Sequence, residues 1–180
     1  MQTQEKLLEC LKLCVSAIEK EAPILNTYQS TIAYLRDASK LLDGKGLNGI
    51  TTRHGHWNNG ICAHTQQGEN HWFSLELAVP QKISRVQITP RLDCLPGCEA
   101  RAQNIRITNG PSKSYDPNEK LCLPEIPQLV MKEGLTDYIC TPPQDEGKFV
   151  KISKGDYKLN LCEVKIFTLT DDTTTDKVEL

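Results

Sequence analysis

The stretch His71-Trp72-Phe73-Ser74-Leu75-Glu76-Leu77-Ala78-Val79 decides the fold, together with Ile83-Ser84-Arg85-Val86-Gln87-Ile88-Thr89 shortly after it. Apolar side chains recur at every second position through Phe73, Leu75 and Leu77, as they do in β-strands with one buried face. Further strand candidates follow at residues 104–108, 137–141, 148–153 and 161–169. Many short strands separated by Gly and Pro turns predict an all-β sandwich or jelly roll.

A helical pattern precedes these strands. Leu7, Leu11, Cys14 and Ile18 recur at spacings of four, three and four residues, which places them on one face of an amphipathic helix over residues 4–21. We expect a short N-terminal α-helix that either packs on its own domain or joins several chains into a homo-oligomer. The chain then divides into a helical segment at residues 1–22, a β domain at 23–170 and a polar tail at 171–180.

The bulk composition excludes two classes of partner. The chain has 180 residues, which is the length of one domain, and 38% hydrophobic and 24% charged residues are ordinary for a globular protein. A net charge of −2 argues against a basic surface that follows nucleic-acid phosphates. No apolar run approaches the roughly 20 residues that span a bilayer. We therefore expect neither nucleic-acid binding nor membrane insertion.

The eight cysteines indicate an oxidising compartment. An even number of cysteines among strand-like segments is typical of disulfide-bonded extracellular domains. The residues after Met1 lack the apolar core of a secretory signal, so the protein is either not secreted or has lost such a signal. Lys177-Val178-Glu179-Leu180 is similar to an ER-retention tetrapeptide, which makes the ER lumen the alternative. We expect an extracellular protein.

Three basic side chains stand in a fixed order at His64, Arg91 and Arg101. One imidazole and two guanidinium groups form a donor-rich set that suits the hydroxyl oxygens of a neutral ligand such as a sugar. A zinc enzyme is the alternative, because His54, His56, Cys62 and His64 are possible zinc ligands. No carboxylate is spaced as a general base and no nucleophile motif is present, so we expect binding without catalysis.

Several motifs carry a resemblance to a known family. Cys62-Ala-His64 is followed after twenty-six residues by Arg91-X-Asp93, then by two cysteines and a basic residue three positions after the second cysteine. The remaining motifs are Ala38-Ser-Lys-Leu-Leu-Asp-Gly44, Trp72-Phe-Ser-Leu-Glu-Leu77 and Leu161-Cys-Glu-Val164. In their order and approximate spacing, residues 38–167 resemble the F-type lectins, also called the fucolectin family.

The resemblance implies a fold and a ligand. The fold would be an eight-stranded jelly-roll sandwich of the discoidin (F5/8 type C) kind, with a sugar site in the loops at one end. His64, Arg91 and Arg101 would donate hydrogen bonds to a terminal fucose or a related sugar of a glycan. Asp93 would orient an arginine, and Trp57 would contact the apolar face of the sugar. Several such sites on one oligomer would raise the avidity for glycans.

The resemblance also implies disulfides, with one departure from the family. The family pairs correspond to Cys62–Cys162 and Cys122–Cys140. The family has two adjacent cysteines beside the sugar, whereas Cys94 and Cys98 are separated here by Leu-Pro-Gly. A Pro-Gly turn allows a Cys94–Cys98 disulfide. The longer loop puts fucose specificity in question, so an adhesion module of the same fold, binding protein or anionic lipid, is the rival interpretation.

A structural calcium ion is the remaining implication of the resemblance. Its ligands correspond to the side chains of Asp43 and Glu163 and to the carbonyl oxygens of Lys45, Ile61 and Cys162. Calcium takes six to eight oxygen ligands, yet Lys40 stands where the family has an asparagine. Either calcium binds here, or the Lys40 ammonium neutralises the two acids in its place.

Overall fold

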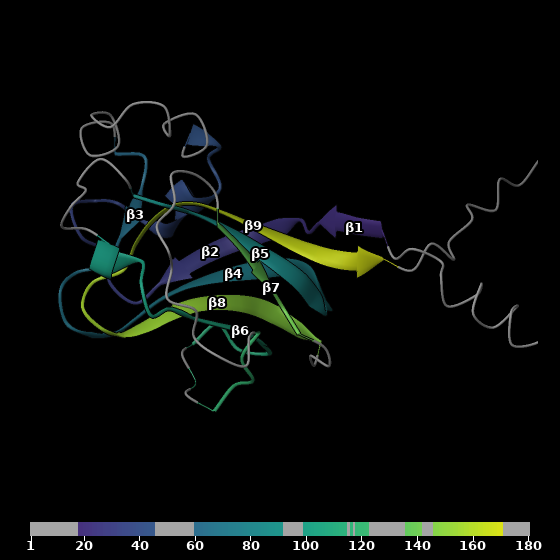
Figure 1. The fold of residues 1–180 in the computed structure, drawn as a ribbon. Helices are drawn as coiled ribbons and strands as arrows, with labels where there is room; N and C mark the ends of the chain where they lie inside the picture. Colours follow the sequence, from purple (N-terminus) through teal and green to yellow (C-terminus); the bar gives the residue numbers. More distant parts are fainter. Residues whose placement is uncertain are drawn as a thin grey trace, which may run out of the picture.

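The structure is a computed structural model in which residues 18–45, 60–91, 99–114, 116, 118–122, 136–141 and 146–170 are described. Two antiparallel sheets face each other as a sandwich (Figure 1). The first sheet has the order β1 (Ile18–Glu21), β9 (Asn160–Thr170), β5 (Ile83–Pro90) and β7 (Thr136–Ile139), and β3 (Ala63–His64) also pairs with β9. The second sheet has the order β2 (Ile24–Gln29), β4 (Glu69–Gln81), β8 (Gly147–Asp156) and β6 (Arg106–Gly110).

The strands expected from the sequence are confirmed, and the N-terminal helix is not. Ile18–Glu21 form strand β1, which pairs with the end of β9 from Ile18↔Thr170 to Glu21↔Phe167. The helical expectation is therefore wrong for these residues, because pairing with a distant strand overrides a short local periodicity. The rest of the expected helix lies outside the described residues. Strands β2 and β3 were not expected.

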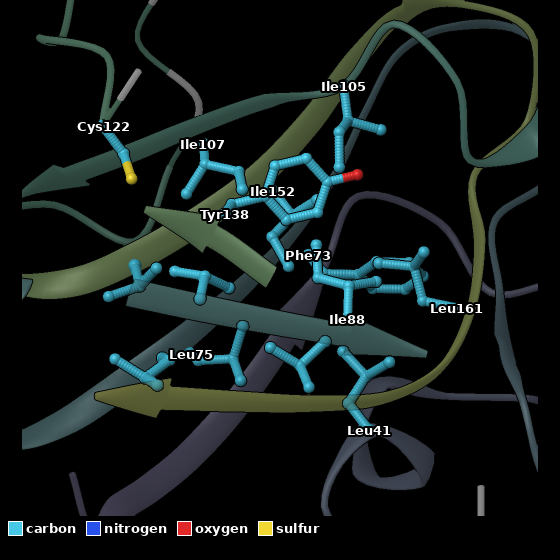
Figure 2. Packing of buried hydrophobic residues seen from close by; sticks show 14 of the residues in the cluster. Leu41, Phe73, Leu75, Ile88, Ile105, Ile107, Cys122, Tyr138, Ile152 and Leu161 are labelled. Atoms are coloured by element: carbon cyan, nitrogen blue, oxygen red, sulfur yellow. The ribbon is translucent and has the colours of Figure 1, made fainter. Parts of the chain in front are cut away.

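The core lies between the two sheets and follows from the alternation that the sequence shows. Phe73, Leu75 and Leu77 on β4 are fully buried, as are Val150 and Ile152 on the neighbouring strand β8. Each such side chain contributes about 1.5–3 kcal/mol when it leaves water. In Figure 2 the side chains of Phe73 and Ile152 lie close to those of Ile88 and Leu161 from the opposite sheet.

Two disulfides of the described residues match the expected pairs. Cys62–Cys162 joins the segment before β3 to β9, and Cys122–Cys140 joins the segments beside β6 and β7. The first closes a loop with a sequence separation of 100 residues. Constraining a loop of that length stabilises a fold by up to about 5 kcal/mol in the chain-entropy model. Cys10, Cys14, Cys94 and Cys98 lie outside the described residues.

Two 3₁₀ turns and β3 lie at the same end of the sandwich. The turns are η1 (Ala38–Leu41) and η3 (Glu99–Arg101). In Figure 1 this end is opposite the one at which β9 finishes. Within the described part of the chain, no helix has the length and apolar character to cross a membrane.

Candidate functional site

His64 is fixed by backbone hydrogen bonds on both sides of β3. Its N–H donates to the carbonyl of Arg36 at 3.0 Å, and its own carbonyl accepts from the N–H of Ala33 at 2.9 Å. On the other side β3 pairs with the start of β9, where Asn160 Nδ2 donates to the carbonyl of Ala63 at 2.6 Å. The side chain of His64 is 1% exposed. Two separate chain segments therefore hold the backbone of His64 in place.

Three cations surround His64. Arg91 follows β5 and is buried, Arg101 ends η3 and is half-buried, and Lys158 lies in the turn before β9. The N–H of Thr65 donates to the carbonyl of Leu159 at 3.0 Å, which brings this turn against β3. The sequence-predicted trio of His64, Arg91 and Arg101 thus meets at one end of the sandwich, with Lys158 added.

Burial and these cations keep His64 neutral. Burial lowers the pKa of His64 to about 4, and the charges of Arg101, Lys158 and Arg91 act in the same direction. Contact with the backbone of Thr65 opposes the shift. At neutral pH the ring therefore carries one N–H donor and one acceptor nitrogen. The site thus offers a neutral imidazole and several permanent cations, as the sequence indicated.

A shallow hollow of about 270 Å³ opens beside His64. We call it the His64 hollow, and its lining includes Ala33, Tyr34, His64, Gln66, Gln67 and Lys158. The ring of Tyr34 lies edge-on to the imidazole, with 5.6 Å between the ring centroids. Arg91 and Arg101 are not among the described lining residues, although both act electrostatically on His64. The hollow combines polar groups with one exposed aromatic ring.

Tyr34 and Lys158 were missed by the sequence prediction. The φ angles of Tyr34 and Leu35 are positive, at 56° and 57°. Tyr157, which precedes Lys158, has a φ angle of 57°. Residues other than glycine rarely adopt this conformation, and it clusters at ligand sites. Tyr34 is 67% exposed. Only the structure reveals these residues, because no local sequence signal indicates a strained turn here.

The other predicted sugar-site residues cannot be placed. Trp57, Asp93, Cys94 and Cys98 lie outside the described residues. The zinc alternative loses one ligand, because Cys62 is bonded to Cys162 and has no thiolate to offer. Within the described ranges no three side chains of His, Cys, Asp or Glu come together as a metal site.

Two lysines lie close to Asp43, one of the residues that the sequence predicts to bind calcium. Its Oδ2 lies 3.9 Å from Nζ of Lys40 and 4.0 Å from Nζ of Lys45, and its Oδ1 accepts from the backbone N–H of Lys45 at 3.0 Å. Glu163 and Ile61 are buried, and Ile61 packs on the Cys62–Cys162 disulfide. Two ammonium groups this close would repel a divalent cation bound to Asp43. A calcium ion at Asp43 would therefore have to displace both ammonium groups.

Comparison with known proteins decides the family. No family model matches the chain. Fucolectin-6 of Anguilla japonica is 35% identical over 112 residues, which cover 60% of this chain and 54% of that relative. Fucolectin-5 of the same species is 31% identical over 145 residues, which cover 78% of this chain and 71% of that relative. The chain belongs to the fucolectin family.

Solved structures show that the fucolectin fold extends over most of the chain. The F-lectin from serum of the striped bass, Morone saxatilis, has a TM-score of 0.63 and 21% identity, and the match covers 82% of this chain and 46% of that one. The lectin domain of lectinolysin, solved with Lewis b antigen, has a TM-score of 0.60 and 18% identity over 81% of this chain and 93% of that one. These likenesses confirm the discoidin-like jelly roll.

Proposed function

We propose that this fucolectin-family chain is a lectin that binds a terminal fucose, or a related sugar, on glycans without cleaving any bond. The observation that carries the proposal is a neutral, buried His64 held among Arg91, Arg101 and Lys158 beside an open hollow. The charges of described residues that act on the imidazole, those of Arg101, Lys158 and Arg91, are positive. Such a set donates hydrogen bonds and suits a ligand whose oxygens accept them.

The geometry suits a deoxy sugar in two ways. Ring and hydroxyl oxygens would accept hydrogen bonds from the guanidinium groups and from the imidazole N–H. The acceptor nitrogen of a neutral imidazole would receive a hydroxyl proton. The exposed ring of Tyr34, next to His64, would cover an apolar methyl or C–H face. Tyr34 would thus provide an apolar contact of the kind that the sequence analysis expects from Trp57.

The relatives support glycans as partners. The lectinolysin domain was solved with Lewis b, a fucosylated glycan, and the Anguilla proteins are named fucolectins. Lectins of this kind recognise sugars reversibly and cleave no bond. The disulfides fit an extracellular protein. We propose secretion as its location, in line with the serum origin of the striped-bass lectin.

A glycan array tests the proposal. The oxidised protein should bind fucosylated glycans, and free L-fucose should compete for them, whereas free D-glucose should not. A folded, oxidised sample that binds no glycan at all would contradict the proposal. Binding that L-fucose leaves unchanged would show a lectin of another specificity.

The rival function has one specific observation in its favour. Ile32, Tyr34 and Leu35 are 50%, 67% and 93% exposed at one loop tip. Exposed apolar tips can insert into a lipid surface or a protein groove. Vesicles of phosphatidylserine and phosphatidylcholine separate the two functions, because a lectin should remain in solution while a lipid-binding module should sediment with them.

We propose that Lys40 and Lys45 neutralise Asp43 in place of calcium. Both ammonium groups lie within 4.0 Å of its carboxylate, which supports this assignment. The melting temperature should then be the same with calcium as with EDTA. The variant Lys40→Asn, which restores the family residue, should gain a calcium-dependent rise. A calcium-dependent rise in the unmodified protein would contradict the assignment.

We also propose that the chain assembles into homo-oligomers through the segment before β1. A single shallow sugar site binds weakly, and several sites on one assembly raise the avidity. Cys10 and Cys14 in that segment could join neighbouring chains. Sedimentation velocity of the full chain, compared with the Cys10→Ser/Cys14→Ser variant, would show a fall in mass if they do. A monomeric full chain would contradict the proposal.

A further inference from the structure

A second hollow lies beside the His64 hollow and has no assigned role. We call it the Trp72 hollow; its volume is about 490 Å³, and its lining includes Tyr28, Gln29, Ile32, Asp37, Trp72 and Lys113. Pockets that bind small ligands usually measure about 300–1,000 Å³. This hollow therefore has the size of a small-ligand site.

The two hollows share a wall. Ile32 lines the Trp72 hollow, while Ala33 and Tyr34, the next residues of the chain, line the His64 hollow. Gln29 passes beneath this wall, because it lines the Trp72 hollow while its Nε2 donates to the carbonyl of His64 at 3.3 Å. A ligand longer than one sugar could therefore reach from one hollow into the other.

The Trp72 hollow has an apolar surface suited to a sugar ring. Trp72 lies on β4 between the buried residues His71 and Phe73, so its side chain points away from the core and is half-buried. No described residue stacks on its indole ring or accepts a hydrogen bond from its Nε1. The indole can thus meet the C–H face of a pyranose, with one N–H donor at its edge.

Hydrogen-bond acceptors and a hydrogen-bond donor complete the lining of the Trp72 hollow. Asp37 Oδ1 accepts from the N–H of Ser39 at 2.9 Å and from its hydroxyl. These bonds lower the pKa of Asp37, so the carboxylate stays charged and no described residue donates to its Oδ2. Oε1 of Gln29 is a buried acceptor that no described residue pairs with. Nζ of Lys113 lies 4.8 Å from the centroid of the Tyr28 ring and supplies a donor.

We propose that the Trp72 hollow is a second carbohydrate subsite, which holds a neutral pyranose next to the fucose in the same glycan. Its C–H face would lie on Trp72, and its hydroxyl groups would donate to Asp37 and accept from Lys113. The inference rests on the proposed fucose site in the His64 hollow. It explains how a chain with a shallow primary site distinguishes between glycans that carry the same terminal sugar.

The test compares L-fucose with fucosylated tri- and tetrasaccharides, Lewis b among them, by titration calorimetry on the full chain. The variant Asp37→Asn removes the charge but keeps a side-chain oxygen that caps η1. We expect its affinity for L-fucose to be unchanged. Its affinity for the best oligosaccharide should fall about tenfold, the loss expected for a hydrogen bond to a charged group. Trp72→Ala should show the same selective loss.

The matched control is Asp116→Asn. Asp116 also accepts from the backbone N–H two residues later, that of Asn118, at 2.8 Å, but it lies outside both hollows. It should leave all affinities unchanged. Equal affinities of wild-type protein for fucose and every oligosaccharide, or an unchanged profile in Asp37→Asn, would overturn the subsite. Failure of the wild-type protein to bind any fucosylated sugar would instead overturn the fucose site itself.

Discussion

Lys151 and His64 are both buried polar groups, but their surroundings differ. Lys151 lies between Val150 and Ile152 on β8, so it faces the outer side of the sheet, and it is 1% exposed. Its ammonium donates to the carbonyls of Ser112 and Ser114 at 2.7 and 3.0 Å and pairs with Glu119. By contrast, the described residues whose charges act on His64 are the cations Arg101, Lys158 and Arg91.

This difference distinguishes buried polar groups that stabilise the fold from those that bind a ligand. Around Lys151 the described bonds satisfy the cation, and they fasten the loop after β6 to the sheet. Around His64 the positive charges of Arg101, Lys158 and Arg91 gather, and such a cluster favours a ligand whose oxygens accept hydrogen bonds. Arg101 has a buried Nε for which no described residue is an acceptor. We interpret the first cluster as serving the fold and the second as serving the ligand.

The largest expected effect concerns Lys151. Replacing it in Lys151→Met leaves the largely buried carboxylate of Glu119 without its cation. Breaking a buried ion pair in this way costs about 3–5 kcal/mol. The free energy of unfolding in urea should fall by that amount, whereas sugar affinity of the folded protein should be unchanged.

The control for Lys151→Met is an exposed ion pair on the other sheet. Lys165 and Glu21 lie 3.2 Å apart, with 29% and 54% of their side chains exposed. Lys165→Met should cost at most about 1 kcal/mol. If both variants lose the same stability, Lys151 is not the structural cation that the comparison requires.

The second effect is a pH dependence of stability at His64. The pKa of His64 lies near 4 in the folded chain and at its ordinary value of 6.5 when unfolded. Between these values the unfolded chain takes up a proton that the folded chain does not. Stability is therefore complete above pH 6.5 and falls by about 3 kcal/mol as the pH drops to 4.

Urea unfolding between pH 7 and 4 measures this dependence. The variant His64→Asn should lose less stability over the same interval than the wild-type protein, because other groups titrate equally in both. Identical slopes would show that His64 titrates normally. The affinity for sugar should stay constant down to about pH 5, since the imidazole remains neutral in this range.

Much of the fold was predictable because its evidence is local. Alternation identified β4, where Phe73, Leu75 and Leu77 enter the core. Strand β1 escaped prediction because four apolar residues at helical spacing run into it, and only the distant partner β9 makes it a strand. Strand β3, with two residues, is too short to show a periodicity.

The site was predictable only as far as its motifs reach. His64, Arg91 and Arg101 stand at family spacings, and the structure brings them together. Lys158 lies at the site because its neighbour Leu159 accepts a hydrogen bond from the N–H of Thr65. Thr65 and Leu159 are far apart in the sequence, so no local motif indicates this contact. Tyr34 depends on a strained turn that its neighbours do not encode. At Asp43 the motif matches the family only in part, because Lys40 lies 3.9 Å from the carboxylate of this acid.

The third effect is on binding. Arg101→Ala removes a half-buried guanidinium that no described carboxylate holds, so stability should change by less than about 1 kcal/mol. The affinity for L-fucose should fall about 10- to 100-fold, the loss of one or two charge-assisted hydrogen bonds. Calorimetry and a thermal melt on the same sample measure both. Unchanged affinity in a folded variant would remove Arg101 from the site.

The smallest effect is expected at Tyr34. Tyr34→Ala removes an exposed ring beside His64, and affinity for L-fucose should fall about fivefold, the contribution of an apolar contact near 1 kcal/mol. Leu35→Ala is the matched control, because Leu35 is 93% exposed at the same tip but does not line the His64 hollow. An equal loss in both variants would indicate a disturbed loop instead of a direct contact.

A crystal structure of the oxidised protein with L-fucose tests the central claim most directly. We expect one sugar in the His64 hollow, with its oxygens within hydrogen-bond distance of the His64 imidazole and of Arg91 and Arg101. Fucose bound elsewhere, with these three side chains bonded only to the protein, would contradict it.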